Sequence, residues 1–150
     1  MRRKLRARRG FTVSEALVDV AILSLMGLAL AAGIPTALHV YRSVTASAEA
    51  SLLCGTLTTA ISDELHFASA PAEDGTFNSA VYGRDVSIHA EGGRVLVGDT
   101  PLLSEQTYTG GLEADVDVKY GGGLFQVDLT ITGDGTELSA ASFAVSPLNP

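Results

Sequence analysis

The chain has 150 residues, of which 46% are apolar and 6% aromatic, and its formal net charge is −7. This length allows one domain with a modest core, and this composition excludes a disordered chain. Six of the ten basic residues lie within residues 1–9, whereas all 17 acidic residues lie from Glu15 onward. Without residues 1–10, four cations would remain against those 17 carboxylates, a formal charge of −13. An acidic body of this kind lacks the cationic surface that nucleic acids require, so we expect no direct binding of nucleic acid.

Residues 1–10 are predicted to form a basic leader on the cytoplasmic side of a membrane. The following residues, 20–38, carry no charge, and with residues 16–18 they approach the ~20 residues of a spanning helix. Three interpretations compete. A secretory signal peptide would be cut at small residues such as 29–31 or 46–48, but Glu15 and Asp19 lie where its apolar region should begin. The other two are a plain single-pass anchor and a signal cut before an apolar helix that is then retained.

The apolar run is predicted to continue into one long helix, from about Phe11 to about Ser69. Residues 11–41 would form its membrane half, with a kink or local melting at Gly33 and Pro35. Residues 42–70 would form an amphipathic half, and Pro71 would end it. The apolar stripe of that half has helical spacing and consists of Ala50, Leu53, Cys54, Leu57, Ile61, Leu65 and Ala68.

Residues 71–150 are predicted to form an antiparallel sheet. A connector, residues 71–83, has one expected short strand near 80–82, and from Arg84 apolar and polar residues alternate. Glycine-containing turns at 91–93, 98–99, 121–123 and 133–135 separate the predicted strands. The dry face of such a sheet needs a cover, and the stripe of the helix is the available one. The sequence therefore predicts an α+β fold, with the helix first and the sheet after it.

Residues 10–15 read Gly-Phe-Thr-Val-Ser-Glu, between the basic leader and the apolar helix. This stretch resembles the amino-terminal motif of type IV pilins and of the pseudopilins of type II secretion and competence systems. The resemblance is specific over about residues 8–38 and continues only as architecture beyond them. It implies cleavage between Gly10 and Phe11 by a prepilin peptidase and N-methylation of Phe11.

The resemblance also implies a structural role and not an enzymatic one. The subunit would be stored as a single-pass membrane protein with its carboxyl-terminal domain outside the cytoplasm. Its partners would be the prepilin peptidase, an inner-membrane assembly platform and other pilin subunits, with which it would form a cell-surface or periplasmic filament. A minor pilin or pseudopilin is favoured over a major pilin, because the sheet has no disulfide-closed loop and the helix carries an extra carboxylate.

Glu15 is the expected assembly residue. An ionised carboxylate in an apolar helix bundle costs several kcal/mol unless it is paired. Cleavage after Gly10 would create an α-amine on Phe11, and Glu15 of a neighbouring subunit could pair with it. Asp19 lies one turn further along the same helix face, as a weaker assembly candidate. It could be protonated, capture a second amine, or stay wet at the headgroup boundary.

The remaining residues offer little other chemistry. Cys54 is the single cysteine, expected to be a buried apolar thiol, with an intermolecular bridge or a reactive thiol as the alternatives. His39, His66 and His89 lack metal-ligand spacing, the turn at Asp134 is more typical of a hairpin than of a Ca²⁺ site, and no cofactor is expected. From a different class, the alternative function is a monomeric, membrane-anchored domain that binds an extracellular ligand.

Overall fold

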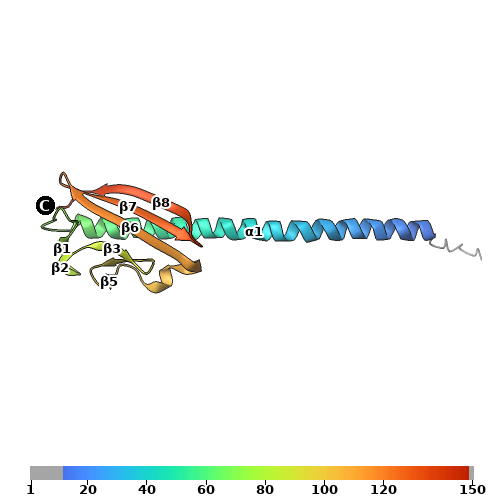
Figure 1. Cartoon of the computed structure of the whole chain (residues 1–150), viewed down its shortest axis with the longest axis horizontal. Helices are drawn as coiled ribbons and strands as arrows, with labels where there is room; N and C mark the ends of the chain where they lie inside the picture. Colours follow the sequence, from blue (N-terminus) through green and yellow to red (C-terminus); the bar gives the residue numbers. More distant parts are fainter. Residues whose placement is uncertain (1–11, 149–150) are drawn as a thin grey trace, which may run out of the picture. The chain divides into compact units, whose positions relative to one another are not determined.

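The computed structural model describes residues 12–148 and has the predicted α+β architecture. One long helix, α1 (Val13–His66), precedes a set of antiparallel strands that pack on its second half (Figure 1). The chain divides into two compact units, residues 1–42 and residues 43–150, so each is described by itself. The first unit contributes the apolar half of α1, and the second contributes residues 43–66 of α1 and every strand.

Helix α1 is continuous through Gly33 and Pro35, so the predicted local melting there is wrong. Proline removes one N–H donor, which leaves only the Ala31 carbonyl without its usual intrahelical partner. The helical turns on both sides keep theirs, and a long helix tolerates one such gap. The helix ends at His66, slightly before the predicted end, and Ser69 then exchanges two backbone hydrogen bonds with Asn78, of 3.0 and 2.8 Å.

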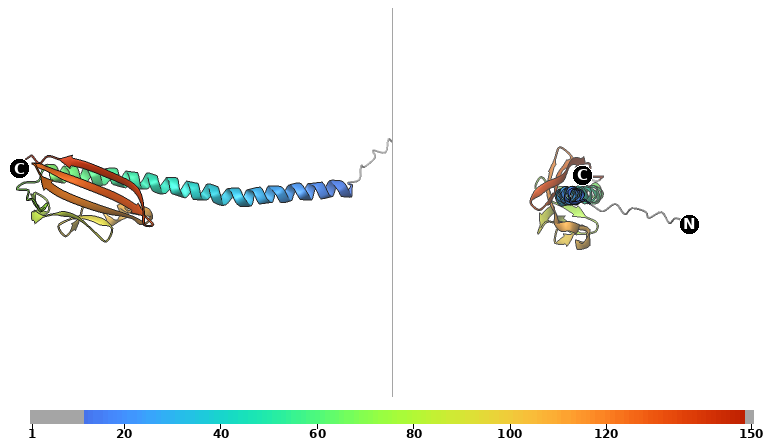
Figure 2. Two further views of the ribbon diagram at one scale, coloured as in Figure 1. Left: turned by 45° about the horizontal axis from the view of Figure 1, so that its top comes forward. Right: turned by 90° about the vertical axis from the view of Figure 1, so that its right-hand side faces the viewer.

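The strands form three small antiparallel sheets instead of the single predicted one. The first sheet pairs β1 (Phe77–Ser79) with β2 (Gly83–Val86), and the second has the order β3 (Ile88–Glu91), β4 (Arg94–Val97), β5 (Thr100–Pro101). The third has the order β6 (Leu112–Gly121), β7 (Leu124–Gly133), β8 (Thr136–Val145), and it lies along the second half of α1 (Figure 2). The Ala114 N–H of β6 donates to the Gly93 carbonyl over 2.8 Å, which ties the β3–β4 turn to the edge of the third sheet.

The strand expected near residues 80–82 is absent, because these residues form the turn between β1 and β2. The Ser79 hydroxyl oxygen accepts the N–H groups of Val81 and Tyr82 over 3.0 and 2.9 Å. A serine that bonds the backbone two or three residues ahead mimics a turn, so residues 80–82 turn between the two strands instead of forming a strand.

One hydrophobic core joins the helix to the sheets. The predicted stripe of α1 is buried throughout, including Cys54, which confirms the buried apolar thiol. It packs with β1, β3, β4 and all three strands of the third sheet, and Phe77 and Phe125 meet edge to face with centroids 5.8 Å apart. Within residues 12–148 no polar or charged side chain is buried, so apolar packing holds this unit together. The core strands alternate as predicted, with Phe125, Val127, Leu129 and Ile131 of β7 inward.

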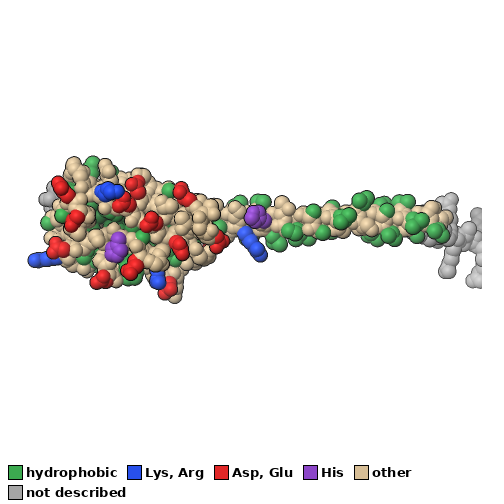
Figure 3. Space-filling view, in the orientation of Figure 1, with side chains coloured by type: hydrophobic (Ala, Val, Ile, Leu, Met, Phe, Trp, Pro, Cys, Tyr) green, Lys and Arg blue, Asp and Glu red, His purple; other side chains and the backbone are tan. Residues whose placement is uncertain are grey.

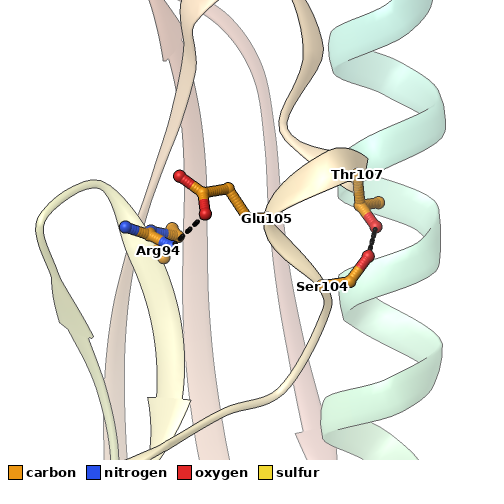
Figure 4. A network of polar contacts seen from close by, with 4 residues as sticks. All are labelled: Arg94, Ser104, Glu105 and Thr107. Atoms are coloured by element: carbon orange, nitrogen blue, oxygen red, sulfur yellow. Dashed lines mark hydrogen bonds and ion pairs between the residues drawn. The ribbon is translucent and has the colours of Figure 1, made fainter.

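Two 3₁₀ turns, η1 (Glu105–Thr107) and η2 (Thr109–Gly111), shape the loop before β6. Figure 4 shows Arg94 of β4 facing Glu105 of η1, with Nη1 and Oε2 3.6 Å apart, and the hydroxyls of Ser104 and Thr107 3.3 Å apart. This ion pair is exposed, so it contributes little to stability. Tyr108 contributes more, because its hydroxyl oxygen accepts the Val95 N–H over 3.1 Å.

Replacing Tyr108 by phenylalanine should lower the free energy of unfolding by about 1–3 kcal/mol, because the partly buried Val95 N–H loses its acceptor. Burial raises the pKa of the Tyr108 hydroxyl above its ordinary value, against smaller opposing effects of the Val95 N–H and the Arg94 charge. The contribution of Tyr108 to stability is therefore full below about pH 10 and is lost as the pH rises above it. Denaturant titrations of both proteins at pH 7 and near pH 11 check this, since their difference should shrink at the higher pH. An unchanged difference would contradict the assignment.

Replacing Gly75 by alanine is predicted to destabilise the strand-bearing unit. Its φ is +83°, and a Cβ there would lie 2.8 Å from the backbone oxygen of Val118. Gly75→Ala should lower the free energy of unfolding by more than about 1 kcal/mol, because strain and a clash with backbone add. Gly121→Ala is the matched control, since nothing lies within 4 Å of its Cβ position and its φ is not positive. Thermal unfolding that is equal for the two variants would contradict this prediction.

Candidate functional site at the start of helix α1

The first turn of α1 is built around a reciprocal pair of hydrogen bonds. The Thr12 N–H donates to Glu15 Oε2 over 2.9 Å, and the Glu15 N–H donates to Thr12 Oγ1 over 3.3 Å. The Thr12 hydroxyl also donates to Glu15 Oε2 over 2.8 Å. This arrangement is a capping box, in which two backbone donors that a helix start leaves unpaired find side-chain partners.

Thr12 is a functional residue that the sequence reasoning missed, although its signal was present. A threonine followed three residues later by a glutamate, just before an apolar run, is the sequence pattern of a capping box. Both hydrogen bonds from Thr12 to the Glu15 side chain go to Oε2. Among residues 12–148, Oε1 accepts no hydrogen bond, so one oxygen caps the helix and the other is open to a donor from outside the described chain.

Asp19 lies on the same face as Glu15, as predicted. Ser14, Glu15, Val18 and Asp19 line one shallow groove along the helix surface, and all of these side chains are exposed. The two other predicted site residues, Gly10 and Phe11, lie outside the described residues, so the predicted cleavage and methylation positions stay predictions.

The helix that follows is long and apolar enough to span a membrane, and the apolar segment is not buried within the described chain. Figure 3 shows apolar side chains along the first part of α1 and acidic side chains over the strand-bearing unit. Exposed leucine, isoleucine, valine and methionine side chains occur on every face of this segment: Val13, Leu17, Val18, Val20, Ile22, Leu23, Leu25, Met26, Leu28, Leu30, Ile34, Leu38 and Val40. An apolar surface on all sides of a helix requires a membrane or a bundle of helices around it.

The rest of the described chain offers no comparable chemical site. Within residues 12–148 no group of three or more His, Cys, Asp or Glu side chains is placed to hold a metal ion. His66 uses its Nδ1 in a 3.0 Å hydrogen bond with the Ser146 carbonyl, and Asp134 lies in the hairpin turn between β7 and β8. Comparisons of the chain with protein-family models, with curated proteins and with solved structures found no match.

Proposed function

We propose that this chain is a structural subunit of a type IV pilus-like filament, as a minor pilin or pseudopilin. The observation that carries the proposal is the position of Glu15. It is a carboxylate in the first turn of an uncovered, membrane-length apolar helix, behind a basic leader that ends in Gly10. A helix that only anchors a protein does not require a carboxylate in its first turn, because an unpaired charge in the apolar part of a membrane is costly.

The hydrogen bonds of Glu15 support separate roles for its two carboxylate oxygens, one in capping the helix and one in binding a neighbouring subunit. Oε2 is held by Thr12 of the same chain, which fixes the carboxylate at the start of the helix. Oε1 has no hydrogen-bond partner within residues 12–148, so it could accept a donor from another chain. A neighbour's α-amine, created by cleavage after Gly10, would pair with this carboxylate and offset the desolvation cost of burying it in a helix bundle.

The strand-bearing unit fits the surface role in such a filament. It has an apolar core, an acidic exterior and no buried polar side chain within residues 12–148, so apolar packing holds its strands on the second half of α1. The prepilin peptidase, the assembly platform and further subunits are the partners that this function requires.

The test is to extract the protein from membranes of a host that carries a prepilin peptidase and to determine its amino terminus by mass spectrometry. A start at N-methylated Phe11 supports the subunit proposal. An intact leader would instead favour the alternative, a monomeric anchored domain that binds an extracellular ligand. Gly10→Val is the control variant, because a branched side chain at the scissile bond should block cleavage while the apolar helix still anchors the chain.

A further inference from the structure

Strand β8 forms an open edge of the third sheet. The order β6–β7–β8 leaves β6 and β8 at its edges, and the β3–β4 turn covers β6 through Gly93. Figure 1 shows β8 on the opposite side of the sheet from β3. Glu137 and a register shift opposite Ile131–Thr132 interrupt the start of this edge, but residues 139–145 contain no charged residue and no proline, which commonly protect exposed edges from pairing.

The register identifies the backbone groups that point outward from β8. The two-residue loop after Gly121 makes Gly121 and Leu124 a hydrogen-bonded pair, and such pairs alternate along antiparallel strands. The odd-numbered residues of β7 therefore bond to β8. Between the register shift at Ile131–Thr132 and the end of β8, it is the even-numbered residues of β8 that direct their N–H and C=O groups away from the sheet. These outward residues are Ala140, Ser142 and Ala144, all exposed, and within residues 12–148 their outward groups have no hydrogen-bond partner.

The dry face of the sheet is also incomplete at this edge. Phe125, Val127, Leu129 and Ile131 of β7 are fully buried. On β8, by contrast, only Val145 is buried, and three other apolar residues that pack against the same core are partly buried: Leu138, Ala141 and Phe143. A further strand with apolar residues at alternate positions would extend the dry face and cover these three side chains.

The charge of residues 43–150 indicates what kind of segment could pair with the open edge of β8. The wet face of the sheet carries Glu113, Asp115 and Asp117 on β6, Asp128 on β7 and Glu137 on β8. Lys119 is the single cation of these three strands, and it contacts Asp117. Asp117 and Asp128 lie directly opposite each other and share the single positive charge of Lys119, so this part of the wet face keeps a net negative charge.

We propose that β8 receives an extended segment of a partner protein by strand addition, with basic residues on the wet face and apolar residues on the dry face. Strands lie ~4.8 Å apart, so the added strand would be ~10 Å from β7. That distance is about one Debye length at 0.1 M salt, and attraction to Asp128 would persist there. A second copy of this chain is disfavoured as the occupant. Of the 17 carboxylates, 15 lie in residues 43–150 with three cations, so this unit of each copy has a formal charge of −12 and two such units repel each other.

The test uses the full chain in nonionic detergent and a ten-residue peptide of alternating lysine and valine as the probe. We expect hydrogen exchange of the Ala140, Ser142 and Ala144 amides to slow at least about tenfold on saturation, because each outward N–H gains an acceptor. Affinity should fall as salt rises, and an alternating glutamate–valine peptide should not bind. Unchanged exchange of these three amides, or equal binding of the acidic peptide, would overturn the proposal. Concentration-dependent protection without peptide would show that a second copy is the occupant and would overturn it too.

Ser142→Pro removes one outward N–H and leaves the β7 ladder intact, as proline at an outward position of an edge strand is tolerated. It should weaken binding of the basic peptide at least about tenfold, while Ser142→Ala, which keeps the N–H, should bind as the parent does. Slow exchange of the Ala141 and Phe143 amides shows that the variant is folded.

Asp128→Asn is the second variant. It should lower the affinity and the salt dependence without touching the backbone, and an unchanged affinity would refute the charge argument. The proposal does not depend on the filament function, because it concerns residues 43–150 alone.

Discussion

Replacing Glu15 by alanine is expected to abolish incorporation of this chain into filaments while cleavage after Gly10 proceeds. Removing one partner of a buried, hydrogen-bonded ion pair costs about 3–5 kcal/mol, because the other charge remains buried and unpaired. On the proposed function, that other charge is the α-amine of a neighbour's Phe11. The penalty corresponds to more than about a hundredfold loss of incorporation, measured by the fraction of subunit in sheared filaments.

The capping box makes a sharper variant available, Glu15→Gln. Glutamine can still accept the Thr12 N–H, as glutamine serves in capping boxes, but it carries no charge. Incorporation lost equally in Glu15→Gln and Glu15→Ala would assign the role to the charge. Normal incorporation of Glu15→Gln would contradict the pairing argument and leave only the cap, which is worth about 0.5–2 kcal/mol.

Two further variants separate the neighbours of Glu15. Thr12→Val removes the hydroxyl that Glu15 Oε2 holds, yet keeps the Thr12 backbone N–H and the charge of Glu15. It should reduce incorporation only modestly. Asp19→Asn tests whether the second carboxylate of the groove takes part in assembly, since a normal phenotype would place Asp19 in the wet headgroup region.

The sequence predicted the parts of the fold that depend on periodicity. Helical spacing located the stripe from Ala50 to Ala68, and all seven of its members are buried. Strict alternation located the inward face of β6 and β7, because a period of two leaves only one choice of buried face. Glycine pairs located the hairpins at 92–93 and 122–123, where both glycines have positive φ.

The sequence-based predictions were wrong or incomplete where a local hydrogen bond or the tertiary arrangement determines the structure. Ser79 bonds its own neighbours and places the expected strand at residues 80–82 in a turn. Division into three sheets could not be predicted, because it depends on which consecutive strands fail to pair, and the periodicity of the sequence does not show the breaks after β2 and after β5. At the candidate site, Glu15 was recognised by its charge in an apolar context, whereas Thr12 was missed because its role is a bond within one helical turn.

Replacing Leu57 by alanine is expected to destabilise the strand-bearing unit strongly. Leu57 is 0% exposed and lies in the middle of the buried stripe, between Cys54 and Ile61. Leucine-to-alanine changes at such sites cost about 2–5 kcal/mol, through lost transfer free energy and the cavity that remains. For a unit of about 100 residues, each kcal/mol lowers the midpoint of thermal unfolding by about 4–8 °C.

Leu52→Ala is the matched control, because it is the same substitution on the same helix at a side chain that is 73% exposed. It should leave the unfolding midpoint within a few degrees of the parent, as surface substitutions away from special features are usually within about 0.5 kcal/mol. Circular dichroism of the full chain in nonionic detergent measures both variants under the same conditions. Equal midpoints for Leu57→Ala and Leu52→Ala would contradict the packing of the strands on this face of α1, and the open edge of β8 would then need a different explanation. A large difference confined to Leu57 would place the stability of the unit in the apolar contact between the helix and the strands.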